Sequence, residues 1–294
     1  MTRLHLEGCG TALLTPFRGG EVDFAAYEAC VRRQVESGVH FLVPLATTGE
    51  TPTLSREEKL RLLDLTRELA PGLPLLTGCG SNSLLATLEN IALLDSHGAD
   101  AFLVVVPFYN KPTQEGQYQY FKAVSEATDK PVVIYNVPGR TGANMSADTC
   151  LRLAHDCPNI IATKEASGNY AQVSAIIASA PEGFSVLSGD DDLTFAFMAT
   201  GGKGVISVAS NIAPREVVEM VNAMLAGDLT RARALHHRLF PLFKACFVES
   251  NPIPAKAAMA YLGLMEDELR LPLSRPAEAT KALMKQTLDT LWQK

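Results

Sequence analysis

The feature that most constrains the fold of this chain is a regular alternation of short apolar runs and longer amphipathic segments. The apolar runs are typical of buried strands and lie at 10–14, 41–45, 75–78, 101–106, 131–136, 160–164, 185–189 and 204–208. Because a segment with helical periodicity follows each run, the pattern indicates a parallel sheet covered by helices. Eight such units without a dinucleotide-binding fingerprint predict an α/β fold, a closed (β/α)8 TIM barrel, rather than a doubly wound sheet.

Several expected helices begin with capping residues. Asp23 is expected to cap the first helix, and the sequence from Ser55 to Glu58 forms a capping box for the second. Asp190 and Asp191 are expected to cap the helix after the seventh strand, an explanation that we prefer to a metal site. The segment 137–142 is expected to be a loop.

The last part of the chain has a different pattern. No strand-like run occurs after about residue 227, and helices are expected at 228–248, 254–262 and 276–292. The sequence therefore predicts a catalytic barrel over 1–226 and a small helical C-terminal domain over 227–294.

Composition excludes several classes of protein. The formal charge is −6 and no Lys/Arg-rich run is present, so we expect no nucleic-acid partner. No apolar stretch is long enough to span a bilayer and Met1 leads directly into folded-looking sequence, so we expect no membrane association and no signal peptide. The six cysteines are scattered without a C-x-x-C pair, which is typical of reduced thiols in a cytoplasmic protein. The six histidines lack metal-ligand spacing, so no metal is expected.

One charged residue stands out among the expected strands. Lys164 ends the apolar run that begins at Ile160. Burial disfavours an ammonium group and lowers its pKa, which exposes the neutral amine that attacks carbonyl groups to form a Schiff base. The strand alone favours a lysine that reaches solvent or pairs with Glu165 or Asp190. The other residues at the same end of the barrel favour the Schiff base.

In TIM barrels the reacting groups collect at the C-terminal ends of the strands. At or just after those ends stand Thr47, Thr48, Tyr109, Tyr135, Arg140, Lys164, Gly189 and Ile206. Tyr135 ends the strand next to that of Lys164, where a phenol can shuttle protons, although a tyrosine at this position, taken alone, is more commonly a core aromatic. Thr47 and Thr48 offer hydroxyls to a carboxylate or a proton relay, or serve only as a turn. Arg140 can hold a substrate carboxylate or form a surface salt bridge.

Separated motifs around these residues occur together and in a characteristic order. They are Ala46-Thr47-Thr48-Gly49-Glu50, Pro107-Phe108-Tyr109-Asn110-Lys111-Pro112, Tyr135-Asn136-Val137-Pro138-Gly139-Arg140-Thr141-Gly142, Lys164-Glu165-Ala166-Ser167-Gly168, Leu187-Ser188-Gly189-Asp190-Asp191, Gly204-Val205-Ile206-Ser207-Val208 and Asn251-Pro252-Ile253-Pro254. On these motifs the chain, from about 10 to 272, resembles the dihydrodipicolinate synthase family of pyruvate-dependent class I aldolases. Ala46 departs from the glycine usual in this family, with little expected effect on pyruvate binding.

The resemblance implies a lyase that condenses pyruvate with L-aspartate 4-semialdehyde to 4-hydroxy-tetrahydrodipicolinate, the first committed step of the diaminopimelate route to lysine. Lys164 would form the Schiff base with pyruvate. Tyr135 would move protons, linked through Thr47 to Tyr109 of a neighbouring subunit. The resemblance also implies a homotetramer built from tight dimers, with no metal or organic cofactor.

The same resemblance implies how the substrates are held. Thr48 and the backbone around Ile206 would hold the pyruvate carboxylate, with Gly189 beside the substrate. Arg140 would receive the carboxylate of the semialdehyde.

Two alternatives to the synthase stay open. N-acetylneuraminate lyases and 2-keto-3-deoxy sugar acid aldolases share the lysine, the tyrosine and the threonine pair. Arg140 and Tyr109 favour a short amino-acid aldehyde over a polyol. A catalytically silent barrel is the second alternative, and the complete set of polar groups at one barrel mouth argues against it.

The resemblance also bears on feedback inhibition. In lysine-sensitive members a cleft at the dimer interface offers histidines, a glutamate and a tyrosine to the inhibitor. The matching positions here are Arg56, Lys59, Ala86 and Phe108. Because a carboxylate is lost and cations are gained, a cationic ligand should bind poorly, so we predict weak inhibition by lysine.

Overall fold

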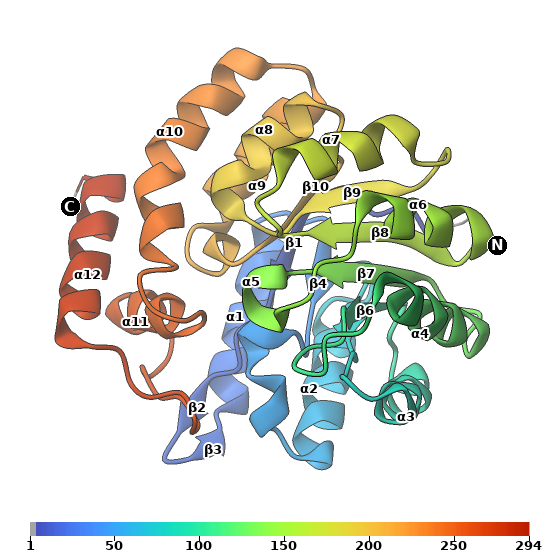
Figure 1. Ribbon diagram of the computed structural model, residues 1–294. Helices are drawn as coiled ribbons and strands as arrows, with labels where there is room; N and C mark the ends of the chain where they lie inside the picture. Colours follow the sequence, from blue (N-terminus) through green and yellow to red (C-terminus); the bar gives the residue numbers. More distant parts are fainter. Residues whose placement is uncertain (1–3, 294) are drawn as a thin grey trace.

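Eight strands form one parallel sheet in the computed structural model, which describes residues 4–293 (Figure 1). The strands are β1 Gly8–Ala12, β4 Phe41–Val43, β5 Leu76–Gly78, β6 Ala101–Val105, β7 Val132–Asn136, β8 Ile160–Glu165, β9 Ser185–Ser188 and β10 Gly204–Ser207. Their order is β4-β1-β10-β9-β8-β7-β6-β5, and a parallel bridge between Leu42 and Leu75 joins the two ends of this order. The sheet is therefore closed, which confirms the predicted (β/α)8 barrel.

Helices surround the barrel and continue beyond it. They are α1 Phe24–Glu36, α2 Arg56–Leu69, α3 Leu84–Asp95, α4 Gln114–Glu126, α5 Pro138–Thr141, α6 Ala147–Asp156, α7 Tyr170–Ser179, α8 Thr194–Ala199, α9 Pro214–Leu225, α10 Leu229–Ala245, α11 Ile253–Tyr261 and α12 Glu278–Trp292. The predicted caps of α1 and α2 are confirmed, because Asp23 accepts from Ala26 N–H and Ser55 and Glu58 form the reciprocal capping box.

One local prediction is wrong, and one element was not expected. The expected loop at 137–142 contains the short helix α5, which Pro138 begins and Gly142 ends with a φ of +70°. The unexpected element is the hairpin of β2, Phe17–Arg18, and β3, Glu21–Val22. Neither element has the length or periodicity that marks a strand or helix in sequence.

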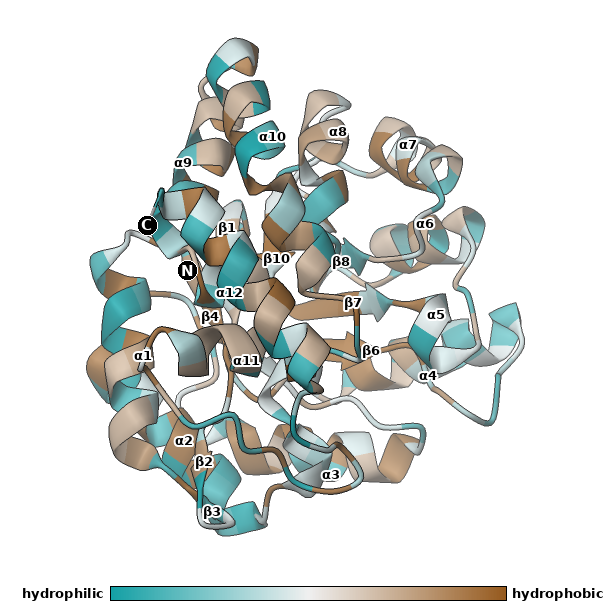
Figure 2. Cartoon of the chain, turned by 90° about the vertical axis from the view of Figure 1, so that its left-hand side faces the viewer, coloured by the Kyte–Doolittle hydropathy of each residue, from teal (hydrophilic) through white to brown (hydrophobic). Residues whose placement is uncertain are grey.

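The apolar residues form two cores because the strands are buried on both faces. The larger core lies between strands and helices and includes Leu42, Phe102 and Ile134. The smaller one fills the barrel and includes Leu103, Val133, Tyr135, Leu187 and Ile206. Figure 2 shows hydrophobic strands inside and hydrophilic positions concentrated on the outer helices. Tyr135 thus belongs to the barrel interior, although it carries a polar group.

Helices α10, α11 and α12 lie along one side of the barrel (Figure 1). Helix α10 contacts α9, and α12 contacts both α10 and α11. None of the helices within residues 4–293 has the length and apolar character needed to cross a bilayer. The expectation that the chain has no signal peptide concerns in part residues 1–3, which lie outside the described residues.

Candidate active site

Lys164 and Tyr135 meet at the C-terminal ends of β8 and β7. The two residues are paired in the parallel register of these strands, so their side chains point to the same face of the sheet. The Lys164 Nζ atom lies 4.2 Å from the centroid of the Tyr135 ring. Only 5% of Lys164 and 8% of Tyr135 are exposed. The amine and the phenol are therefore neighbours in a site from which most water is excluded.

Burial changes the ionisation of both groups. It lowers the pKa of Lys164 from 10.5 to about 8, because the charged ammonium loses hydration, and the carboxylates of Asp190 and Asp191 only partly oppose this. Burial raises the pKa of Tyr135 to about 12. At neutral pH the phenol therefore keeps its proton, while a substantial fraction of the amine is neutral and nucleophilic.

Glu165 does not serve as the partner of Lys164. It is buried and accepts hydrogen bonds from Asn136 Nδ2 at 3.1 Å and from Ser167 N–H at 2.9 Å. These bonds tie the end of β8 to the end of β7 and to the following loop. Glu165 thus fixes the strand that carries Lys164, while the amine itself stays available.

Gly189 leaves room for the lysine side chain. A β-carbon at this position would lie 3.1 Å from Lys164 Cε and 2.6 Å from Ala166 Cβ. Any larger residue would therefore push against the Lys164 chain or its neighbouring loop. The sequence singled out Gly189 as a substrate contact, and the structure places it against the lysine.

Thr47 and Thr48 lie in a single 3-10 turn, Thr47–Gly49, directly after β4. Thr48 is 3% exposed, and its Oγ1 accepts a hydrogen bond of 2.9 Å from Asn251 Nδ2. Thr47 is exposed and lines the cavity described next. The two hydroxyls therefore differ in role. Asn251 holds that of Thr48, whereas that of Thr47 is free toward the cavity.

A cavity of about 380 Å³ opens at this end of the barrel. Polar residues on its wall include Thr47, Thr51, Lys59, Ser81, Asn90, Tyr135 and Arg140. Apolar residues such as Leu103, Val105 and Phe108 complete the lining. Thr48, Lys164, Gly189 and Ile206 are outside this lining, and the Tyr135 ring connects the cavity with the buried amine.

Arg140 reaches the cavity from α5. Its Nη2 atom donates to the carbonyl of Asn251 at 3.3 Å, which orients the guanidinium at the cavity wall. The same Asn251 also holds Thr48, so one residue of the C-terminal part contacts two of the predicted site residues. Sequence reasoning placed Asn251 only within a motif and assigned it no role.

Tyr109 also lies outside the cavity lining of its own chain, and unlike the other predicted residues outside that lining it is at the surface. It is 87% exposed, has a φ of +72°, and is not part of the cavity lining. Its backbone N–H donates to the carbonyl of Thr141 at 3.3 Å, so the backbone around it is held although its ring projects into solvent.

The predicted capping by Asp190 and Asp191 is wrong. No side-chain cap bond is made by Asp190 at the start of the 3-10 turn Asp191–Leu193. Asp191 is 2% exposed and accepts from Ser207 Oγ at 2.5 Å and from the N–H groups of Val208 and Ala209 at 3.0 Å. It therefore fixes the loop just after Ile206, where the resemblance places backbone contacts to pyruvate.

Comparison with known proteins agrees with this geometry. Residues 5–291 match the model of the dihydrodipicolinate synthetase family. The chain belongs to this family.

Individual members of the family are similar over nearly their whole length. A 4-hydroxy-tetrahydrodipicolinate synthase of Koribacter versatilis is 52% identical over 283 residues, which cover 95% of this chain and 94% of that protein. The crystal structure of dihydrodipicolinate synthase from Thermotoga maritima is 44% identical with a TM-score of 0.97, and the match covers 99% of this chain and 100% of that one. A structure described as a monomeric dihydrodipicolinate synthase variant is 45% identical with a TM-score of 0.96, covering 98% and 97% of the two chains.

The described part of this family member, 4–293, contains no group of three or more His, Cys, Asp or Glu side chains placed to hold a metal ion. All six cysteines are free and buried.

Proposed function

We propose that the chain catalyses the condensation of pyruvate with L-aspartate 4-semialdehyde to 4-hydroxy-tetrahydrodipicolinate, in the diaminopimelate route to lysine. The observation that carries this proposal is the buried Lys164 amine 4.2 Å from the Tyr135 ring, at the end of a barrel whose cavity presents Thr47 and Arg140. Membership of the family supports the same reaction.

The first half of the reaction uses the amine. The neutral Lys164 amine attacks C2 of pyruvate to form a carbinolamine, which loses water to give the imine. Tyr135 donates the proton that the departing hydroxyl requires, which leaves a protonated imine and a tyrosinate. The tyrosinate then takes a proton from the methyl group, which converts the protonated imine into a neutral enamine and restores the phenol. Thr48 and the backbone near Ile206 hold the pyruvate carboxylate during these steps.

The second half forms the ring. The enamine carbon attacks the aldehyde carbon of the semialdehyde, and the new alkoxide takes up a proton. The amine of the same substrate then attacks the imine carbon and displaces the Lys164 amine, so the ring closes and the enzyme returns to its starting state. Arg140 holds the carboxylate of the semialdehyde through its fork of donors. The lysine nitrogen supplies the electron sink, so the proposed steps need no metal or organic cofactor.

A direct test is intact mass after incubation with pyruvate and borohydride, peptide mapping, and an assay of turnover with the semialdehyde. We expect an adduct on Lys164 together with turnover. An adduct without turnover would move the proposal to a sugar acid aldolase, because these enzymes share the lysine chemistry. No adduct on Lys164 would remove the mechanism and favour the silent barrel.

We also propose that the chain assembles as a homotetramer of tight dimers, with Tyr109 crossing into the site of the neighbouring subunit. Exposed apolar side chains support a subunit interface at the surface that carries Tyr109, because Leu85 is 69% exposed and Phe108 39% exposed. Asn110 Nδ2 donates to the carbonyl of Asn82 at 2.9 Å, so the segments around Asn110 and Asn82 lie side by side.

Subunit complementation tests the crossing tyrosine. Lys164→Arg and Tyr109→Ala chains are each expected to be nearly inactive as homodimers. A mixed dimer would contain one intact site, formed by Lys164 of one chain and Tyr109 of the other, so activity should return on mixing. If no activity returned in mixed dimers verified by native mass spectrometry, Tyr109 would not act across the interface. The same measurement gives the assembly state.

The division into a catalytic barrel, 1–226, and a helical domain, 227–294, is likewise proposed. It is supported by the position of α10, which begins at Leu229 after the last βα unit. Limited proteolysis with preferential cleavage near 227 would support this boundary.

A further inference from the structure

The turn that carries Thr47 and Thr48 is bounded by two residues in an unusual backbone conformation. Leu45 and Glu50 are not glycine, yet their φ angles are +56° and +52°. Residues with a β-carbon occupy this left-handed region only where their surroundings hold them. The segment 45–50, which we call the threonine turn, therefore depends on contacts that fix its ends.

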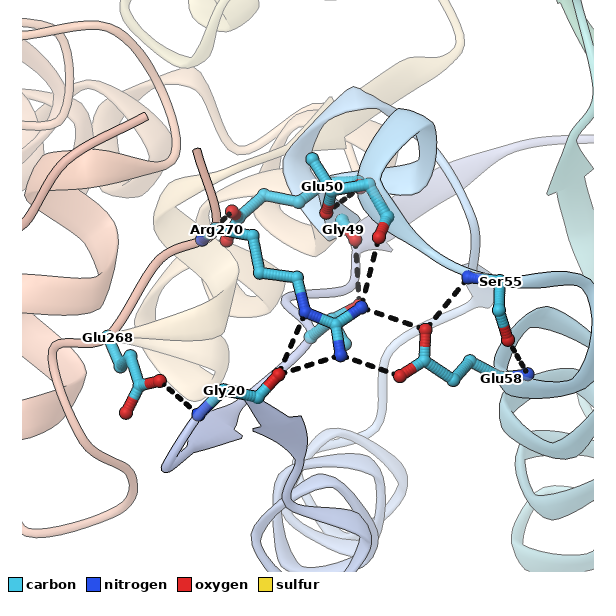
Figure 3. A network of polar contacts seen from close by, with 9 residues as sticks. Gly20, Gly49, Glu50, Ser55, Glu58, Glu268 and Arg270 are labelled. Atoms are coloured by element: carbon cyan, nitrogen blue, oxygen red, sulfur yellow. Dashed lines mark hydrogen bonds and ion pairs between the residues drawn. The ribbon is translucent and has the colours of Figure 1, made fainter. Parts of the chain in front are cut away.

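Glu50 makes such a contact at the C-terminal end of the threonine turn. Its side chain is 1% exposed, and Oε1 lies 2.5 Å from Lys256 Nζ. Its Oε2 accepts a hydrogen bond of 3.1 Å from the backbone N–H of Arg270, drawn in Figure 3. Lys256 lies on α11 and Arg270 in the segment that follows it. The Glu50 carboxylate thus joins the turn to the C-terminal helices.

Lys256 is completely enclosed at this junction. It is 0% exposed, its Nζ donates to the carbonyl of Glu268 at 2.8 Å, and it lies 4.1 Å from the centroid of the Phe17 ring. A buried ion pair adds little net stability, because both charges lose their hydration. We therefore explain this pair by its effect on conformation, because a buried ion pair can select one conformation of the chain.

Neighbouring contacts hold the same C-terminal segment against the barrel (Figure 3). The Arg270 guanidinium donates to both carboxylate oxygens of Glu58, at 2.8 and 2.6 Å, and Glu268 accepts from Gly20 N–H at 2.5 Å. These contacts reach α2 and the β2–β3 hairpin. Within this group of contacts, those of Glu50 act on a left-handed residue of the threonine turn itself, while Asn251 separately holds Thr48.

We propose that Glu50 and Lys256 are positioning residues, whose buried ion pair holds the threonine turn so that Thr47 and Thr48 face the barrel mouth. The inference rests on the proposed function, because pyruvate chemistry gives these hydroxyls their task. Both residues act through the turn rather than by touching the substrate.

Three variants separate positioning from stability. Glu50→Gln and Lys256→Met each leave a buried charge without its partner, so both should lower the thermal midpoint and the activity. The double variant removes both charges, so its thermal midpoint should return to within a few degrees of the wild-type value. Its turn loses the ion pair with Lys256 although the bond from Asn251 to Thr48 remains, and we expect kcat/KM for pyruvate to stay about ten-fold or more below wild type, mainly through a higher KM.

A matched control changes the same residue type elsewhere. Lys281 on α12 pairs with Asp267 at 2.9 Å and with Glu278 at 3.0 Å, away from the turn. Lys281→Met should leave kcat/KM unchanged. Glu50→Asp adds a variant that keeps both charges but withdraws the carboxylate by one methylene, and it should raise KM for pyruvate by a few-fold while the chain stays folded.

The outcomes separate this inference from the proposed function. A double variant or Glu50→Asp with wild-type kcat/KM would overturn the positioning role while leaving the reaction intact. A wild-type chain that traps pyruvate on Lys164 but does not turn over the semialdehyde would refute the proposed reaction, and the trapping rates of the same variants would still decide the positioning role. A wild-type chain that forms no adduct would overturn both.

Discussion

The pH dependence of pyruvate capture is the sharpest consequence of the buried amine. Burial lowers the pKa of Lys164 from 10.5 to about 8. The difference between these two pKa values corresponds to roughly 3 kcal/mol, and it raises the fraction of neutral amine at pH 7 about 300-fold. Capture should therefore be rapid at neutral pH, where an ordinary lysine is almost entirely protonated.

The measurement is the initial rate of adduct formation at limiting pyruvate with cyanoborohydride, followed by intact mass between pH 6 and 10. Below pH 8 the rate should rise about ten-fold for each pH unit, because only the neutral amine attacks, and it should level off above pH 8. Lys164→Arg serves as the control and should give no adduct. A circular dichroism spectrum at each pH establishes that the chain stays folded.

Asp190 offers an internal check on the physical cause. Its carboxylate is the strongest of the charges that raise the pKa of Lys164 against the effect of burial. Asp190→Asn should therefore move the midpoint of the rate profile to lower pH. A midpoint near 10 in the wild-type chain, or an upward move in the variant, would refute the argument that desolvation sets the reactivity of the lysine.

Four further predictions follow from the same geometry. Because the pKa of Lys164 is lower in the folded than in the unfolded chain, the unfolded state binds more protons between about pH 8 and 10.5, and the free energy of unfolding rises with pH in that window. Below pH 8 the buried charge of Lys164 lowers the free energy of unfolding by up to about 3 kcal/mol. Lys164→Met should therefore raise the thermal midpoint at pH 7. Arg140→Ala should raise the KM for the semialdehyde much more than that for pyruvate, and steady-state kinetics showing equal small effects would favour a sugar acid substrate. Gly189→Ala should slow adduct formation about ten-fold or more by displacing the Lys164 chain, whereas an unchanged trapping rate would mean that the loop yields. Lysine should inhibit only weakly, because Arg56 and Lys59 add positive charge at positions that the resemblance assigns to the inhibitor cleft at the dimer interface, and a half-inhibitory concentration in the micromolar range would contradict this.

The barrel and the main pair of the site were within reach of sequence reasoning for a simple physical reason. Buried parallel strands are continuous apolar runs, so β7 and β8 were visible, and parallel strands direct all their C-terminal ends to one rim. Tyr135 and Lys164 therefore had to become neighbours once the strand order was known. Strand limits moved by one or two residues, as for β1 at Gly8–Ala12 against the expected 10–14, because chain pairing rather than residue type sets the ends.

Interactions between distant segments were out of reach. Asp191 was assigned to a local cap because an aspartate before a helix usually makes one. Its actual partners are Ser207 and the N–H groups of Val208 and Ala209, which only the pairing of β9 with β10 brings near. Tertiary contact thus replaced the local hydrogen bond, and no pattern within the segment distinguishes the two outcomes.

The C-terminal helices show the same limit with a consequence for function. Nothing in the sequence singles out Glu50 or Lys256 as a buried pair, since glutamate and lysine are seldom fully buried. The structure instead buries them together, and it uses Asn251 to hold both Thr48 and Arg140. The lysine–tyrosine pair belongs to the barrel alone, whereas Thr48 and Arg140, which hold substrate carboxylates in the proposed reaction, are held by Asn251 beyond it. Changes at Asn251 should therefore alter KM before they alter the capacity of Lys164 to form its adduct.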